Sequence, residues 1–128
     1  MSVERDRPLS PHLQIYRLPL NAVLSITHRL TGMVLALGAA LVIFVLIAAA
    51  SGAAAYESAH AVVASWPGQV VLFLFTAALY YHLCAGIRHL VWDAGHGYSL
   101  RAARIGSYAV LAGTVALTLL TWLIALVV

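Results

Sequence analysis

The sequence contains no lysine, a single cysteine and few charged side chains of any kind. Its 128 residues are 63% hydrophobic and 9% charged, whereas a soluble domain carries roughly 25% charged residues. So little charge cannot cover a water-facing globule, and we therefore expect a membrane protein. The net charge of +3 is small and gathers near segment ends, which indicates membrane topology rather than binding to nucleic acid.

The single cysteine and the character of the N-terminus exclude further classes. Cys84 lies inside an apolar segment, so this chain by itself makes no internal disulfide and no thiolate metal cluster. The N-terminus is charged and interrupted by proline, unlike a signal peptide, and it is not the Arg/Ser-rich, acid-poor sequence of a transit peptide. We expect a location in a bacterial inner membrane, with a mitochondrial inner membrane as the alternative.

Three long apolar stretches predict the fold. Each exceeds the roughly 20 helical residues that cross a hydrocarbon core about 30 Å thick, and backbone polar groups inside a bilayer must pair within a helix. We expect an all-α integral membrane bundle of three transmembrane helices, with Ser65 and Pro67 as start signals of the second. The spans are expected at about residues 21–51, 66–92 and 105–128, joined by a small-residue loop (52–64) and a Gly/Ser-rich turn (94–99).

The arginines predict the orientation of these helices. They lie before the first span, at residues 5, 7 and 17, and after the second span, at residues 101 and 104, whereas the first loop carries only Glu57. The positive-inside rule then places the N-terminus on the cytoplasmic side and the C-terminus outside. Residues 1–20 are expected to form a cytoplasmic or interfacial arm, and residues 21–128 the membrane domain.

Two polar constellations interrupt the apolar spans. His82, Gly86, His89 and Asp93 recur at i, i+4, i+7 and i+11 and therefore share one helical face. Ionisable groups at membrane depth are costly and usually face a bundle interior or a bound cofactor. Gly86 has no side chain, which lets a flat ligand approach the helix between the two histidines.

The second constellation stands at the start of the first span. Ser25, His28, Arg29 and Gly32 fall at i, i+3, i+4 and i+7, again on one face. A hydroxyl, an imidazole and a guanidinium can hydrogen-bond a carbonyl or a carboxylate, and arginine is the best fork for a carboxylate such as a haem propionate. His82 is expected roughly 10 Å deeper than His89, a depth that suits an axial ligand in the apolar core.

Simpler interpretations of these residues stay open. A histidine in a membrane helix is often only a hydrogen-bonding group between helices, and Arg29 and Arg88 are alternatively interface anchors. Asp93 either caps the following turn or pairs with Arg88 or His89. His28 is expected near the membrane edge and His82 near the middle, so the two are poorly matched as ligands of one haem, and a second ligand from another chain fits better.

Taken together, the motifs resemble a known family. The segments Arg7–Tyr16, Ser25–Gly32 and His82–Asp93 closely resemble, in order and spacing, the cytochrome b556 membrane anchors of succinate dehydrogenase (complex II), and the resemblance covers essentially the whole chain. It implies a second small membrane anchor as partner, with an iron–sulfur subunit and a flavoprotein subunit docked at the membrane face. It also implies one haem b, shared with the partner anchor, and ubiquinone as the substrate.

The resemblance assigns roles to individual residues. It implies that His82 is the axial haem ligand and that the other axial ligand comes from the partner anchor. It implies that Ser25 and Arg29 contact the quinone and that His28, Arg29 and His89 lie near the haem propionates. Such a chain is a non-autonomous subunit that carries no catalytic residue of its own.

Two other functions are alternatives to this one. A haem-free structural anchor of a succinate dehydrogenase or fumarate reductase complex would use His82 only for helix packing. A small transporter or channel subunit is disfavoured because the sequence lacks paired broken helices and acidic residues in its spans.

Overall fold

The computed structural model describes residues 15–127. In this part of the chain every regular element is a helix, and there is no strand. The helices are α1 (Leu20–Ala50), α2 (Ala53–Ala64), α3 (Trp66–Asp93) and α4 (Leu100–Val127). Of these, α1, α3 and α4 are long and apolar enough to cross a membrane, which confirms the three predicted spans. The proposed arm lies largely outside the described residues, so its boundary stays a prediction.

The ends of the spans follow from local capping. Helix α1 begins directly after Pro19, and the Ser65 side chain accepts a hydrogen bond from the backbone N–H of Gly68 at the start of α3, as predicted. Helix α4 begins at Leu100 rather than at Ile105. The Ser99 hydroxyl accepts the backbone N–H of Ala102 and so caps the helix five residues earlier than hydropathy indicates.

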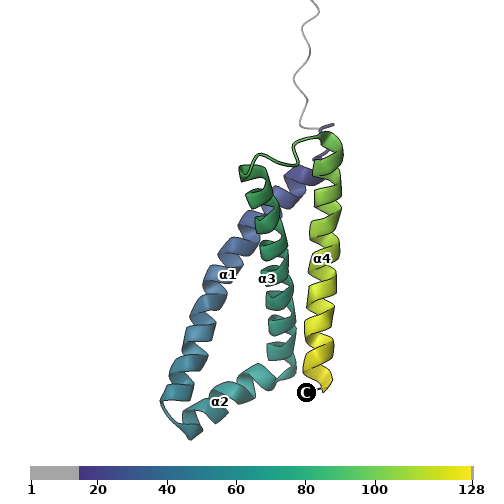
Figure 1. Ribbon diagram of the computed structural model, residues 1–128. Helices are drawn as coiled ribbons and strands as arrows, with labels where there is room; N and C mark the ends of the chain where they lie inside the picture. Colours follow the sequence, from purple (N-terminus) through teal and green to yellow (C-terminus); the bar gives the residue numbers. More distant parts are fainter. Residues whose placement is uncertain (1–14, 128) are drawn as a thin grey trace, which may run out of the picture.

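The predicted loop between the first two spans is wrong, because residues 53–64 form helix α2. Gly52, at a φ of 112°, breaks the chain after α1, but the following residues are rich in alanine, the strongest helix former. Helix α2 joins the distant ends of α1 and α3 (Figure 1). Gly68 permits the close turn into α3, since a Cβ there would lie 2.3 Å from the carbonyl oxygen of Val62.

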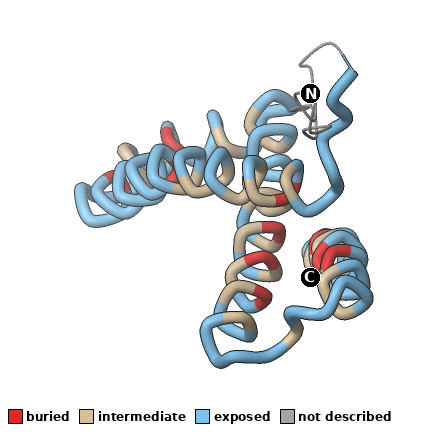
Figure 2. Tube along the Cα trace, turned by 90° about the horizontal axis from the view of Figure 1, so that it is seen from above, coloured by how far each residue is buried: buried red, intermediate tan, exposed pale blue. Residues whose placement is uncertain are grey.

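Helix α3 is the middle element of the bundle. It packs against α1 on one side and α4 on the other, whereas α1 and α4 make few contacts with each other. Figure 1 shows α1 leaning away from α3 toward the end where α2 lies. Buried positions are confined to the facing sides of the helices (Figure 2), and large apolar side chains cover the outer faces, as expected of a surface in contact with lipid.

Small residues and buried hydroxyls hold α3 to its neighbours. Gly38 on α1 faces the ring of Phe75, and a Cβ at Gly38 would lie 1.8 Å from the ring. The buried Tyr81 hydroxyl donates a hydrogen bond of 2.8 Å to the carbonyl oxygen of Leu24 on α1, and the Tyr80 hydroxyl lies 2.7 Å from that of Thr121 on α4. Close approach at glycine and hydrogen bonds between helices are the usual means of association in lipid.

Candidate functional site

Three histidines from two helices meet between α1 and α3. The ring of His28 on α1 stacks on that of His82, with centroids 4.1 Å apart and planes inclined by 17°. It also lies 5.0 Å from the ring of His89. The sequence patterns on the two spans therefore converge on a single cluster, which we call the histidine cluster (His28, His82, His89).

The expected mismatch in depth between His28 and His82 is wrong. His82 and His89 are about 10 Å apart along α3, and the His28 ring contacts both of them, so it occupies the interval between them. The stacked arrangement nevertheless presents ring faces, not nitrogens, to one another. Two axial ligands of one iron must point nitrogens at each other across the metal, so His28 and His82 are unsuited to ligating one haem together.

Hydrogen bonds indicate which ring nitrogen of neutral His82 carries the proton. Its Nδ1 lies 3.2 Å from the backbone carbonyl oxygen of His28 and 3.3 Å from the Thr31 hydroxyl. A carbonyl oxygen only accepts, so Nδ1 carries the proton and donates it, and Nε2 retains its lone pair. This is the arrangement found for metal-bound histidines, in which the N–H of the second ring nitrogen is donated to a carbonyl or carboxylate.

Two glycines lie beside rings of the histidine cluster. A Cβ at Gly32 would lie 3.1 Å from Cε1 of His82, so the glycine makes space for that imidazole, and a Cβ at Gly86 would lie 3.9 Å from Nε2 of His28. The same Nε2 is buried and has no hydrogen-bond partner among residues 15–127. Leaving such an atom unpaired costs about 1–3 kcal/mol, which favours a partner from outside this chain. The donor set therefore fits a haem held at His82, with His28 beside it.

Ser25 and Arg29 lie on the same helix as His28 but take no part in the ring contacts of the histidine cluster. His28 points toward α3, whereas Arg29, one residue further around α1, is exposed and Ser25 is half-buried. Neither side chain hydrogen-bonds to another residue in the part of the chain that the structure describes. Both are consequently available to a ligand or to a second chain packed against α1.

A second polar group was not anticipated from the sequence. Arg88 is only 6% exposed, so its interpretation as an interface anchor that reaches into water is wrong. It donates a hydrogen bond of 3.0 Å to the fully buried hydroxyl of Ser107 on α4, which in turn donates to the side-chain oxygen of Asn21 on α1. This link joins all three spans. No pattern marks Ser107 within its apolar helix, so sequence alone offered no signal for it.

Asp93 takes no part in either group. It is exposed at the end of α3, and the expected pairing with Arg88 or His89 is not found within residues 15–127. The guanidinium of Arg88 instead lies over the ring of Trp92, 4.6 Å from its centroid. Within residues 15–127 no three His, Cys, Asp or Glu side chains are placed to hold a metal ion together, so a metal at the histidine cluster requires ligands from a cofactor or a partner.

Comparison with known proteins gives a consistent result. Residues 4–121 match the family of succinate dehydrogenase/fumarate reductase transmembrane subunits. The chain is 47% identical over 119 residues to the succinate dehydrogenase cytochrome b556 subunit of Paracoccus denitrificans, covering 93% of this chain and 92% of that protein.

Other relatives cover the chain to a similar extent. The cytochrome b556 subunit of Rickettsia felis is 37% identical over 120 residues and covers 94% of each chain. The cytochrome b560 subunit of Reclinomonas americana is 40% identical over 126 residues, covering 93% of this chain and 86% of that protein. Membrane subunits from bacteria among these relatives, together with three apolar spans, agree with an inner-membrane location. The chain belongs to the succinate dehydrogenase/fumarate reductase transmembrane subunit family, as a non-autonomous membrane subunit of the cytochrome b type.

Proposed function

We propose that this chain ligates one haem b through His82, in a complex that passes electrons from succinate to ubiquinone. The observation that supports this proposal is the hydrogen bond at Nδ1 of His82. Its Nδ1 is engaged by the carbonyl oxygen of His28, which leaves Nε2 as the free donor. When bound, haem supplies a one-electron carrier. A second haem ligand would come from a partner membrane anchor, since the His28 ring stacks face to face on that of His82 and so cannot share one iron with it.

The other histidines are proposed to hold the haem propionates, together with Arg29. The unpartnered Nε2 of His28 can donate to a carboxylate in the neutral tautomer that carries the proton on Nε2, and the ring of His89 lies 5.0 Å from that of His28. Arg29, exposed on this chain, can supply a forked pair of donors. These groups would bind and orient the propionate edge of the haem, while His82 would bind its iron in the apolar interior.

Quinone reduction is proposed to use Ser25 and Arg29. The Ser25 hydroxyl can donate a hydrogen bond to a quinone carbonyl, and the Arg29 guanidinium can stabilise negative charge as it develops on the reduced oxygen. Fixed charge of this kind acts strongly in a site of low dielectric. The electrons are proposed to reach the quinone from a flavoprotein subunit through an iron–sulfur subunit.

The proposed orientation places the N-terminus in the cytoplasm and the C-terminus outside. Arg101 and Arg104 are exposed at the start of α4, at the end of the bundle where α1 begins and α3 ends (Figure 1). The opposite end, where α2 lies, carries Glu57 as its one charged residue. The positive-inside rule therefore supports this orientation, and the flavoprotein and iron–sulfur subunits would dock at the arginine-bearing face.

The first test is a reduced-minus-oxidised absorbance spectrum of the purified complex. Wild type is compared with His82→Ala and with His60→Ala, a control histidine exposed on α2. We expect a b-type band in wild type and in His60→Ala, and a lost or shifted band in His82→Ala. An assembled wild-type complex without the band would instead establish a haem-free anchor, in which His82 serves helix packing.

The second test addresses the quinone site. Arg29→Ala is expected to lower quinone reductase activity by about 10- to 100-fold, the loss of one charge-assisted hydrogen bond of about 1.5–3 kcal/mol. Glu57→Ala, which removes an exposed charged side chain from α2 at the opposite end of the bundle, is the control and is expected to retain activity. Full activity in an assembled Arg29→Ala complex would refute the assignment.

A further inference from the structure

Arg88 is a buried cation without a counter-ion in the described part of the chain. Its side chain is 6% exposed, and one nitrogen, Nη1, donates to Ser107. The other two nitrogens, Nε and Nη2, are buried and have no partner among residues 15–127. An unpaired charge inside a membrane protein is costly, so the guanidinium calls for an anion.

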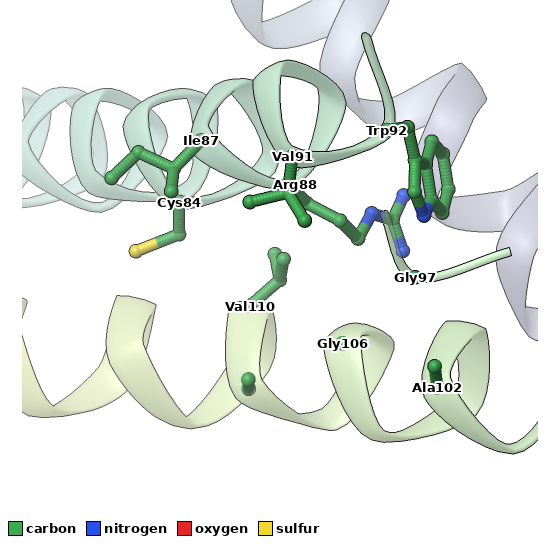
Figure 3. A pocket seen from close by; sticks show the side chains of 10 residues that line it. Cys84, Ile87, Arg88, Val91, Trp92, Gly97, Ala102, Gly106 and Val110 are labelled. Atoms are coloured by element: carbon green, nitrogen blue, oxygen red, sulfur yellow. The ribbon is translucent and has the colours of Figure 1, made fainter. Parts of the chain in front are cut away.

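Arg88 also lines a cavity between α3 and α4. The cavity holds about 300 Å³ and is open rather than enclosed. Figure 3 shows the Arg88 side chain running along it, with the guanidinium at the end near Trp92 and Gly97. Apart from Arg88 its walls are apolar or glycine, and they include Cys84, Ile87 and Val110.

The shape of the guanidinium defines the ligand it can take. Nε and Nη2 form one edge of the plane, and this edge donates two parallel hydrogen bonds to two oxygens of a carboxylate or phosphate. The remaining contacts hold the plane in place: Ser107 binds the opposite side, Trp92 covers one face at 4.6 Å, and Gly106 leaves room for the stem of the side chain. The fork is therefore preorganised for an oxyanion.

The lining of the cavity and its position along α3 restrict the chemical class of the ligand further. An apolar lining with one cation suits an amphiphile with one anionic group. Arg88 stands five residues, or about 7.5 Å, before the end of α3 at Asp93, and Trp92 beside it is a residue type typical of the membrane interface. In the proposed orientation this end of α3 lies near the cytoplasmic membrane face, where the polar headgroups of phospholipids are found.

We propose that Arg88 and this cavity bind the phosphate of a membrane phospholipid, with the glycerol and acyl portion along the apolar wall. The arginine site differs from the histidine cluster, because Arg88 faces α4 while His28 on α1 packs against His82 and His89. The two groups meet at Trp92, whose ring lies 5.3 Å from that of His89.

The test measures phospholipid retained by the complete complex after extensive detergent washing, using native mass spectrometry and phosphorus analysis. The variants are Arg88→Gln, which removes the charge, and Arg88→Lys, which keeps the charge without the fork. Arg104→Gln, exposed on the same membrane face, is the control. We expect one phospholipid to be lost from Arg88→Gln, with affinity reduced by about 10- to 100-fold, and an intermediate loss from Arg88→Lys. Equal phospholipid in wild type and in Arg88→Gln would overturn the proposal.

A second variant covers the possibility that Arg88→Gln does not assemble. Ala102→Leu fills the cavity near the guanidinium (Figure 3) and leaves Arg88 in place. Loss of the phospholipid supports the proposal, and full retention contradicts it.

Adding ligands back to the delipidated complex identifies the source of the phosphate. A gain in thermal stability with phosphatidylglycerol, but not with inorganic phosphate, supports the lipid. An equal gain with inorganic phosphate would replace the lipid site with a site for the free ion. Absence of a gain with either would overturn the proposal.

Discussion

Replacing Gly32 with alanine should disturb His82 without removing it. The new Cβ would lie 3.1 Å from Cε1 of His82, whereas ordinary contacts begin at about 3.4 Å. The imidazole must therefore move by about 0.3 Å away from α1. The carbonyl oxygen of His28, which accepts from Nδ1 at 3.2 Å, belongs to α1, so the same movement lengthens a hydrogen bond already at its normal limit.

The size of the effect follows from that hydrogen bond. Side-chain hydrogen bonds between membrane helices contribute about 0.6 kcal/mol on average and up to about 1.7 kcal/mol. Losing this one should weaken haem retention by about 3- to 16-fold. The assay follows transfer of haem from the purified complex to excess apomyoglobin, and the absorbance band of the remaining haem should shift because the ligand ring is tilted.

Gly113→Ala provides a matched control on the other side of α3. Its Cβ would lie 3.1 Å from the sulfur of Cys84, so the steric insult is similar, yet no histidine is touched. Haem loss from Gly113→Ala should resemble that of wild type. Equal haem loss and equal spectra in Gly32→Ala and Gly113→Ala would refute the view that Gly32 positions His82.

Two further predictions concern the packing of α1 on α3. Gly38→Ala would bring a methyl group to 1.8 Å from the Phe75 ring, so the ring must move by about 1.6 Å to reach 3.4 Å; we expect a loss of about 1–3 kcal/mol, seen as a lower melting temperature of the complex and relieved by adding Phe75→Leu. If the double variant melts no higher than Gly38→Ala alone, the proposed clash between residue 38 and the Phe75 ring is contradicted. Tyr81→Phe removes the buried hydrogen bond to Leu24 and should cost about 0.6–1.7 kcal/mol in reversible unfolding in mixed micelles, whereas an unchanged stability would show that the bond contributes nothing.

The three spans could be predicted because hydropathy and length act locally. A segment that must bury its backbone in lipid is marked by its own composition, and Ser65 and Pro67 mark the start of the second span. Helix α2 cannot be predicted in this way, because its small residues, such as Ala53 and Ala64, are equally typical of a loop. In a segment that is too polar and too short to span the membrane, composition does not distinguish a loop from an alanine-rich helix.

The candidate site was predictable in its members but not in its geometry. Helical spacing grouped His82 with His89 and placed His28 on a polar face. Counting residues from the membrane edge could not show that the His28 ring fits between the other two, because that depends on how α1 crosses α3. The link from Arg88 through Ser107 to Asn21 was beyond sequence reasoning for the same reason, since its three members come from three different helices.

The central position of α3 has a consequence for biogenesis. Helices that are made first can fold first, and α3 follows α1 in the chain. The histidine cluster draws only on these two helices, so it needs no residue of α4, which is synthesised last. Arg88 is different, because its partner Ser107 arrives with the last helix. Insertion of the chain in its natural direction thus completes the histidine cluster first and closes the arginine site last.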